Sequence, residues 1–469
     1  MNQSKKCFTT KLDINDALKM ELAIAGICFE MKQTGFPLDI EECNRQISQL
    51  NERIDWVDSV VMPFIPPKPK AYGVTVSKVF KMNGEPTKMV TDWFKEDSHM
   101  VVGEFTRITF EPINLGSASQ VKAWLLKNGW QPQEWNYKKD ARGKEIKDRE
   151  GNKIKSSPKI TADSLDDLEE LGQAGRLISY REKVKHRRNQ LKGFLKNCRT
   201  DGRVPSVVNT LGAETRRMTH SVIVNVPNPN KKKQFWPIVR KVFYSGSSNY
   251  VVVGADASQI QIRGLVHYAA ALGDWSGVET FRKIDAGEAK DFHEVNGETA
   301  GVSRQDSKGL FYGYIFGAGI PKTAKQLGRT EKETKAIRAK FDKAVPYFKK
   351  VVDHLVKFYR KYGYITGLDG VKIFVESEHM LLCYLLQNFE AVLVKHALIV
   401  AYRKIKEENL DAKVVTFQHD EFQFICHKDH ANRLKEVLEE SMIESGTIVG
   451  SNCPILGEAK IGLTWYDTH

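Results

Sequence analysis

The stretch VVVGADASQIQIRGL, residues 251–265, raises the first question about the fold. Its apolar start predicts a buried strand, and this strand ends by presenting an aspartate, Asp256. Taken alone, an aspartate just after a buried strand is most often a turn or helix-cap residue. A functional interpretation of Asp256 therefore needs a matching acidic group from another part of the chain.

A second apolar stretch supplies that group. VVTFQHDEFQFICH, residues 414–427, predicts a β-hairpin whose tip carries His419, Asp420 and Glu421. Two strands that each bring one aspartate to the same edge of a sheet would form a two-carboxylate site. Such a site suits Mg²⁺, which takes oxygen ligands and keeps positions open for water and phosphate. A pair of these ions would stabilise both the attacking and the leaving oxygen in a displacement at phosphorus.

A third stretch, RQDSKGLFYGYIFGAG (residues 304–319), carries cations and aromatic rings at intervals of four: Arg304, Lys308, Tyr312 and Phe316. On a helix these side chains share one face. Two cations followed by two rings suit a triphosphate followed by a base. The alternative is a solvated Arg–Lys pair with its aromatic neighbours in the core. Upstream, AKDFHEV places His293 where an imidazole could donate a hydrogen bond to a phosphate.

The composition favours a polyanionic partner. The chain has 71 Lys and Arg against 58 Asp and Glu, a net charge of +13, and 41% hydrophobic residues. This balance suggests nucleic acid, although a merely basic protein would share it. Scattered cysteines without a CxxC pair argue against a disulfide framework or structural zinc, and favour a reducing compartment. We find neither a signal peptide nor an apolar stretch of about 18 residues, so we expect a cytoplasmic protein without a membrane span.

Helical and strand-like patterns alternate along the chain. Helical spacing runs from residue 13 to about 50 with a break at 34–39, and returns at 117–130 and at roughly 163–197. Residues 64–110 predict a strand-rich insertion: IPPKPKAYG as a linker, then VTVSKVFKM and GEFTRITFEP as short strands. The charged run at 137–159 predicts a flexible loop or an exposed hairpin. Basic residues within 163–197 fit either a solvated helix face or a helix along a phosphate backbone.

Together these stretches resemble DNA polymerase family A, and above all the replicative polymerases of short-tailed bacteriophages. Three motifs of the family are matched. Asp256, Ser258 and Arg263 match D-x-S-x-x-E-x-R, and His419, Asp420 and Glu421 match H-D-E. The motif R-x3-K-x3-Y/F-G is matched by Arg304, Lys308, Tyr312 and Gly313. Further matches are D-I-H (Asp291–His293), T-x-R (Thr215, Arg217), N-x-P (Asn225, Pro227), L-D-G (Leu368–Gly370) and Gln387. They occur in the family order, and the end GLTWYDTH resembles the phage enzymes' tail.

The resemblance implies an α+β, right-hand polymerase fold with a helical thumb, helical fingers and a palm built on a small antiparallel sheet. It assigns residues 1–200 to the thumb and N-terminal helices, and the insertion at about 64–110 lies within them. Two segments, 201–263 and 365–469, are assigned to the palm, and residues 264–364 to the fingers. The implied function is that of a DNA-directed DNA polymerase that adds dNTPs to a primer 3′ end in viral DNA replication.

Site roles also follow from the resemblance. It implies that Asp256 and Asp420 bind two Mg²⁺ ions together with the backbone carbonyl of Ala257. The triphosphate would be held by His293, Arg304 and Lys308, and Lys308 would also protonate the leaving pyrophosphate. Tyr312 would sit beside the nucleotide sugar and base. Contacts with the primer–template are implied for Arg217, Gln387, His419 and Glu421.

Three positions depart from the family pattern. Gln261 stands where the family has a glutamate that blocks the ribose 2′-hydroxyl and hydrogen-bonds a fingers tyrosine. Phe316 stands in place of that tyrosine, so both partners of one interaction are changed. Our hypothesis is that the steric wall remains while the hydrogen bond is lost, which leaves the preference for dNTPs present but weaker. The third departure is Cys383, where relatives often carry asparagine.

Two features concern partners. Relatives carry a proofreading 3′–5′ exonuclease domain before the thumb, whereas thumb-like helices begin almost at Met1 here, so we expect no proofreading by this chain; a separate exonuclease subunit could supply it. Phage relatives place a processivity-factor loop in the region of residues 64–110, and host thioredoxin is the best-known partner. The alternative is an insertion that contacts DNA directly or contacts nothing.

Two other functions fit the same residues. One is a polymerase with relaxed sugar selection, which Gln261 leaves room for. The other is a degenerate polymerase that acts as a DNA-binding or scaffold protein. Retention of both aspartates and of the stripe from Arg304 to Tyr312 argues against decay of the active site.

Overall fold

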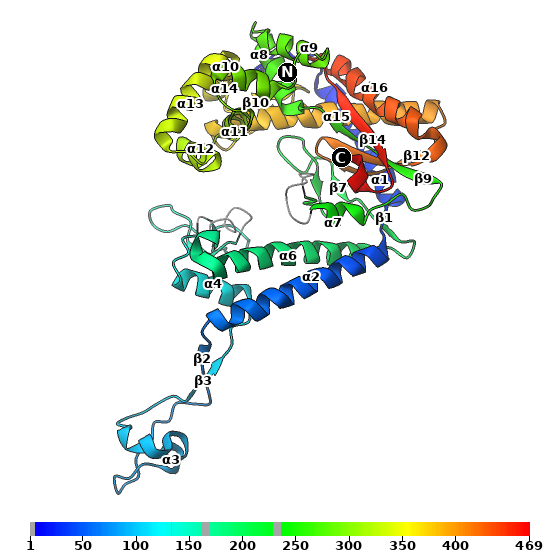
Figure 1. Ribbon diagram of the computed structural model, residues 1–469. Coiled ribbons are helices and arrows are strands. Elements are labelled where there is room, and N and C mark those ends of the chain that lie inside the picture. The colour runs from blue at the N-terminus through cyan, green and yellow to red at the C-terminus, as the bar shows by residue number, and fades with distance from the viewer. Residues whose placement is uncertain (1–4, 133, 161–167, 228–235) are drawn as a thin grey trace. The chain divides into compact units, whose positions relative to one another are not determined.

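The computed structural model describes residues 5–132, 134–160, 168–227 and 236–469. Its contacts divide the chain into two compact units (Figure 1). The first comprises residues 1–44 and 191–469, and the second comprises residues 45–190. The predicted site residues all belong to the first unit.

A four-stranded antiparallel sheet organises the first unit. Its strands lie in the order β12 (Ala412–Gln418), β13 (Glu421–His427), β9 (Tyr250–Ala257) and β14 (Gly457–Gly462). β9 is a central strand because its residues 252–255 are apolar or glycine and buried. α1 (Ile14–Thr34) packs on β12, and α16 (Ala431–Val449) packs on β9 and β14. The strand predicted before Asp256 and the hairpin predicted around Asp420 are both confirmed.

α15 (Leu381–Glu407) is the long core helix of this unit, and it packs against α1, α8, α14 and α16 (Figure 1). By length and composition it could cross a membrane, but 78% of its apolar window is buried inside the protein. Its apolar character is therefore explained by the core it fills.

Helices occupy most of residues 260–362. They are α8 (Ile260–Ala271), α9 (Ser276–Asp285), α10 (Phe292–Ala300), α11 (Arg304–Ile315), α12 (Ile320–Leu327), α13 (Glu331–Ala344) and α14 (Pro346–Tyr362). Asp291 caps α10 and Ser303 caps α11 through side-chain oxygens that accept backbone N–H groups. Buried aromatic side chains, including Phe292, Phe311 and Phe348, join these helices to the main core.

Short strand pairs and turns complete the first unit. The pairs are β1 (Phe36–Pro37) with β6 (Arg203–Val204), β7 (Val208–Asn209) with β8 (Thr219–His220), and β10 (Ile365–Thr366) with β11 (Lys372–Ile373). The remaining helical segments are α7 (Trp236–Lys241), η4 (Glu378–Met380), η5 (Lys428–His430) and η6 (Trp465–Thr468). All seven cysteines of the chain are free thiols, as their spacing predicts.

The second unit is built on long helices. Its elements are most of α2 (Ile40–Val61), η1 (Met62–Phe64), β2 (Lys68–Ala71), α3 (Lys88–Phe94), η2 (Lys95–Met100), β3 (Ile108–Glu111), α4 (Ala118–Lys127), β4 (Trp135–Tyr137), β5 (Lys155–Pro158), η3 (Leu168–Leu171) and most of α6 (Gly172–Asn197). Val57 and Val61 of α2 pack with Leu125 and Ile178 in its core. The charged run at 137–159 forms hairpins, and residues 163–167 of the predicted helix lie outside the described residues.

The insertion differs in detail from its prediction. The proposed linker supplies a strand instead, because Lys68–Ala71 pairs with Ile108–Glu111 in a two-stranded ribbon. VTVSKVFKM is not a strand, since it makes only isolated bridges, Val76 with Phe105 and Phe80 with Pro86. The second half of this segment folds back on itself instead, because the backbone N–H of Lys81 donates to the carbonyl of Glu85 and that of Thr87 donates to the carbonyl of Val79. A small core of Val76, Val79 and Val90 holds this segment together.

Candidate active site

The predicted acidic pair lies where two neighbouring strands of the sheet end. Asp256 is the next-to-last residue of β9, and Asp420 belongs to the two-residue turn between β12 and β13. The backbone N–H of Ala257 donates to the carbonyl of Asp420 over 3.1 Å. Asp256 is the cross-strand partner of Glu421, the residue after Asp420. The backbone therefore brings both aspartates to one edge of the sheet, as predicted.

Left-handed backbone conformations fix the approach to each aspartate. His419, directly before Asp420, has φ 57°, and Gln259, three residues after Asp256, has φ 52° at the start of α8. A non-glycine residue in this region costs about 1 kcal/mol or more, and such costs concentrate at functional sites. Both turns are tight because the chain must change direction right beside the carboxylates.

Glu421 is the neutralised carboxylate of the group. It is buried, and Arg240 Nη1 lies 3.1 Å from its Oε1, while His469 Nε2 lies 3.0 Å away and Trp465 Nε1 also donates to it. Although burial opposes ionisation, the charge of Arg240 and the hydrogen bond from His469 lower the pKa of Glu421 to about 2. Glu421, which the resemblance assigns to the primer–template, therefore makes its hydrogen bonds inside the protein.

Asp256 and Asp420 lack such partners among the described residues. Burial, and then the charge of Glu421, raise the pKa of Asp256 to about 7, although its side chain keeps access to water. Burial, followed by the charges of Glu390 and Asp256, raises the pKa of Asp420 well above its usual range. Two carboxylates that repel each other in a confined site favour a bound cation.

The donor set fits Mg²⁺. Asp256 and Asp420 offer carboxylate oxygens, and the carbonyl of Ala257 lies on the same strand end, so oxygen is the donor type that this ion prefers. The described residues contain no group of three or more His, Cys, Asp or Glu side chains that could hold a metal by themselves. A metal at this position would complete its coordination with water, backbone oxygen and substrate phosphate.

The predicted stripe forms on α11. Arg304 and Lys308 are exposed, Tyr312 is half-buried, and Phe316 follows as the C-cap residue with 50% of its surface exposed. The rings of Tyr312 and Phe316 are stacked with centroids 6.3 Å apart. Arg304 Nε donates to Asp291 over 2.5 Å, in an ion pair that stays half exposed. Burial and the charges of Asp420 and Glu390 raise the pKa of Tyr312.

His293 lies beside this stripe on α10. It is buried, and its ring centroid is 6.0 Å from that of Tyr312. Burial lowers the pKa of His293 to about 4; the charge of Asp291 opposes this shift, whereas the charges of Lys308 and Arg304 add to it. Its Nδ1 has no hydrogen-bond partner among the described residues. The imidazole is therefore neutral near pH 7 and can donate through one ring nitrogen.

Two of the residues assigned to the primer–template, Arg217 and Gln387, contact side chains of α15. Arg217 Nη2 donates to both carboxylate oxygens of Glu390, and Gln261 Nε2 donates to Glu390 Oε2 over 2.9 Å. Gln387 Nε2 donates to Cys383 Sγ over 3.2 Å, so the departure at Cys383 gives Gln387 a weak sulfur acceptor. The exposed His419 packs edge-on against the ring of His220.

Sequence reasoning missed Glu390 and the cluster of Arg240, Trp465 and His469 around Glu421. For Glu390 a signal existed, because it is an acidic residue within the apolar run LLCYLLQNFEAVLV. Burying a charge requires a partner, so an acid in such a run marks an unusual environment. Arg240 carries no comparable signal, since it lies more than 150 residues from Glu421 and only the fold joins them.

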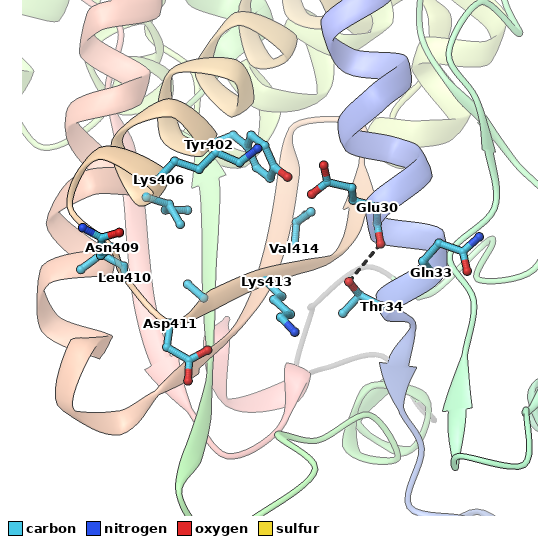
Figure 2. Close-up of a pocket in the computed structure, with 12 residues that line it drawn as sticks. Glu30, Gln33, Thr34, Tyr402, Lys406, Asn409, Leu410, Asp411, Lys413 and Val414 are labelled. Atoms are coloured by element: carbon cyan, nitrogen blue, oxygen red, sulfur yellow. Dashed lines mark hydrogen bonds between the residues drawn. The ribbon is translucent and has the colours of Figure 1, made fainter.

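A cavity of about 610 Å³ lies elsewhere in the first unit (Figure 2). It is bounded by α1, the end of α15 and the start of β12, and its lining includes Glu30, Lys406, Asp411 and Lys413. None of the predicted site residues lines it.

Comparisons with known proteins identify the family of the chain. The profile of DNA polymerase family A matches residues 87–467. The chain is 23% identical over 80% of its length to a DNA-directed DNA polymerase of Escherichia phage Phieco32, and it covers 73% of that protein. It is 26% identical over 59% of its length to the DNA-directed DNA polymerase of Escherichia phage T7, and it covers 43% of that protein. It is also 28% identical over 61% of its length to DNA polymerase I of Aquifex aeolicus, of which it covers 49%. The chain therefore spans less than half the length of the phage T7 and Aquifex relatives.

A solved structure shows the same fold. The POL domain of Pol1 from M. smegmatis, in complex with DNA primer-template and dNTP, matches 97% of the chain with a TM-score of 0.71 and 18% identity. This confirms the predicted α+β polymerase fold, and the family match confirms the predicted DNA-directed DNA polymerase. The chain belongs to DNA polymerase family A.

Proposed function

We propose that this protein extends a DNA primer with dNTPs by template-directed nucleotidyl transfer, and that Asp256 and Asp420 hold two Mg²⁺ ions with the carbonyl of Ala257. The observation that carries the proposal is the pair of aspartates at one sheet edge, for which the described residues provide no salt-bridge partner and whose pKa values are raised. Bound Mg²⁺ would supply Lewis acidity at the reacting phosphate.

The chain's own groups would bind and orient the nucleotide. Arg304 and Lys308 are exposed on one face of α11, where they can pair with triphosphate oxygens. Lys308 is also the cation that could return a proton to the leaving pyrophosphate. The neutral His293 would add one N–H donor to the phosphates, and Tyr312 would hold the sugar and base.

On the primer side, Arg217, Gln387 and His419 offer donors to the minor groove and the primer terminus. Arg217 is half-buried and oriented by Glu390, while His419 is exposed at the hairpin turn. Phosphate and sugar contacts would fix the register of the duplex, and base-edge contacts would test the primer terminus.

Primer extension tests the proposal. The purified chain, a short primed template, Mg²⁺ and dNTPs should give full-length product, and Asp420→Ala should abolish it while leaving primer–template affinity in place. Asp429→Ala, which removes an exposed aspartate just after the far end of β13, serves as the matched control and should extend normally. Binding without extension by the unaltered chain would contradict the proposal and favour a binding or scaffold role.

Finer aspects rest on the resemblance to phage enzymes. We propose a role in viral DNA replication in the host cytoplasm, supported by the similarity to the polymerases of phages Phieco32 and T7. Absence of proofreading by this chain stays a prediction. A primer with a mispaired 3′ end and a 3′ label tests it: the label should persist when the purified chain is added without dNTPs, and its release would show exonuclease activity.

The insertion is proposed as the site of a processivity factor. Its segment between residues 64 and 110 exposes large apolar side chains, among them Phe64, Val74, Met82, Met100 and Val102. The test is product length in a single binding event, measured with a DNA trap, with and without purified bacterial thioredoxin. Longer products that depend on residues 72–107 would support this partner, and unchanged products would exclude thioredoxin.

A further inference from the structure

α1 is apolar on two opposite sides. Its inner side packs into the main core through Met20, Ile24, Ile27 and Met31. Its outer side carries four large apolar side chains, each with between 59% and 68% of its surface exposed: Ile14, Leu18, Leu22 and Phe29. These four positions, called here the outer stripe, span about 80° of the helix circumference. A helix that is apolar all round is normally buried all round, and a contiguous exposed apolar patch marks an interaction site.

The two ends of the outer stripe carry opposite charges. At the C-terminal end, the cavity of about 610 Å³ opens beside Glu30 of α1 and is also lined by Lys406 and Lys413 (Figure 2). Both lysines are exposed, and neither forms an ion pair with a described residue. The N-terminal end is acidic, because Asp13 is the N-cap of α1 and Asp16 lies in its first turn. A partner that presents an acidic group to the lysines and a cation to the aspartates therefore fits this surface.

A second copy of the chain has this complementarity when its α1 lies antiparallel to the first. With a two-fold axis beside residues 23 and 24, Leu18 faces Phe29 of the second copy, and Leu22 faces the exposed Ala25. Large side chains are thus opposite each other at the ends, and a large one is opposite a small one near the centre. The acidic first turn of each helix then approaches the lysine-lined pocket of the other copy. Every contact is made twice, since a two-fold interface is isologous.

Two charged residues beside the outer stripe fit the same register. Lys19 and Glu30 lie on one flank of α1, about three turns apart, and both are exposed without an ion-pair partner among the described residues. In the antiparallel register, Lys19 lies beside Glu30 of the second copy. A parallel pairing would instead bring Lys19 against Lys19 and Glu30 against Glu30, so the charges favour the antiparallel one.

We propose that the outer stripe is the interface of a homodimer, in which two chains pack their α1 helices antiparallel across a two-fold axis. This inference goes beyond the proposed function, because neither metal binding nor primer extension requires a second copy. A single helix pair buries less surface than a standard interface, so the dimer is reversible, with a Kd in the micromolar range. The dimer carries two active sites on one particle.

Sedimentation velocity of the full chain without DNA tests the inference. Between about 1 and about 100 µM, the chain should pass from monomer to dimer as the concentration rises. Leu22→Gln should raise the Kd at least about 10-fold, because this side chain is buried once in each copy. Ile443→Gln, which changes an exposed apolar side chain on α16, is the matched control and should leave the Kd unchanged.

Charge reversal tests the antiparallel register. Lys19→Glu and Glu30→Lys should each weaken the dimer about 3- to 10-fold, because each places two like-charge contacts in the interface. An equimolar mixture of the two variants should restore the parent affinity, since every contact in the mixed dimer again joins opposite charges. Association through apolar surface alone would not show this recovery. Lys413→Glu should also weaken the dimer, because it repels the acidic first turn of the second copy.

Three outcomes would overturn the inference. Monomers at every concentration would leave the outer stripe to a different protein, and a dimer that persists in Leu22→Gln would place the interface elsewhere. Single charge variants that dimerise like the parent would exclude the antiparallel register. Thermal unfolding checks that each variant folds, which we expect because the changed side chains are exposed. Primer extension by Leu22→Gln should equal that of the parent, so failure of the dimer is distinguishable from failure of the proposed function.

Discussion

Arg240 pairs with Glu421 and Arg217 pairs with Glu390 beside the active site. Asp256 and Asp420 have no salt-bridge partner among the described residues, and their pKa values are raised. The two glutamates are buried and hold their surroundings in place. The two aspartates are strained by burial and by mutual repulsion, which a divalent cation would relieve. Residue identity alone does not separate these roles, because the difference lies in the partners.

The raised pKa of Asp256 predicts how the metal-free protein responds to pH. A carboxyl with a folded-state pKa of about 7 and an unfolded one near 4 gives stability that is fully present below about pH 4 and lost as the pH rises through 7. Asp256→Asn cannot ionise, so the variant does not lose this stability as the pH rises. In EDTA we expect the variant to be more stable than the parent by about 1 kcal/mol at pH 8, a value reduced for solvent exposure, and equal to it near pH 4.

Urea unfolding at the two pH values measures this difference, and an equal difference at both would contradict it. Mg²⁺ provides the control. Added at pH 8, it should raise the melting temperature of the parent more than that of Asp256→Asn, because the variant has lost one metal-binding carboxylate.

Arg240 should be among the most important cations for stability. Arg240→Met leaves the buried Glu421 with the neutral or weakly basic donors His469, Trp465 and Gln423, and breaking a buried ion pair costs about 3 kcal/mol or more. Arg282→Met removes a pair with Glu279 in which both side chains are more than half exposed, so it should cost less than about 0.5 kcal/mol. Denaturant unfolding compares them, and similar losses would show that Glu421 finds other compensation.

At the scale of elements, the crossing of α8 and α15 depends on a missing side chain. A Cβ on Gly264 would lie 2.7 Å from the ring of Phe389, which is fully buried. Gly264→Ala should therefore destabilise the protein by about 1–3 kcal/mol through overpacking.

Gly26→Ala is the matched control, since Gly26 lies inside α1 with open space around its Cβ position. This change should stabilise the protein by about 0.5–1 kcal/mol, because alanine is the better helix former. Opposite signs for the two alanine substitutions, measured by denaturant unfolding, are the expected result. Stabilisation by both would show that α8 and α15 adjust to the added methyl group.

The elements of the site were predictable because their patterns are local. Each pattern is visible within about fifteen consecutive residues. The patterns are an apolar run ending in Asp256, an apolar hairpin interrupted at His419 and Asp420, and a stripe of four residues on α11. Strand pairing in the insertion was not predictable, since Lys68–Ala71 has a weak strand pattern and becomes a strand only through its partner some forty residues away. The partners of Glu390 and Glu421 depend on the fold in the same way.

For the whole molecule, the sign of the net charge has a measurable consequence. The chain carries +13, and the site itself exposes Arg304 and Lys308. If the protein binds a primer–template mainly through phosphates, binding releases counterions and its affinity falls steeply with salt. With about six phosphate contacts, raising the salt from about 50 to about 200 mM should weaken binding about 10³-fold.

Fluorescence anisotropy of a labelled primer–template, titrated at several NaCl concentrations, measures this slope. A neutral osmolyte at matched osmolality is the control and should leave the affinity unchanged, because it releases no counterions. Replacing chloride by glutamate should change the absolute affinity more than the slope, since the slope counts the neutralised phosphates. An affinity that does not depend on salt would mean that the basic excess serves another surface, and that base and sugar contacts alone hold the duplex.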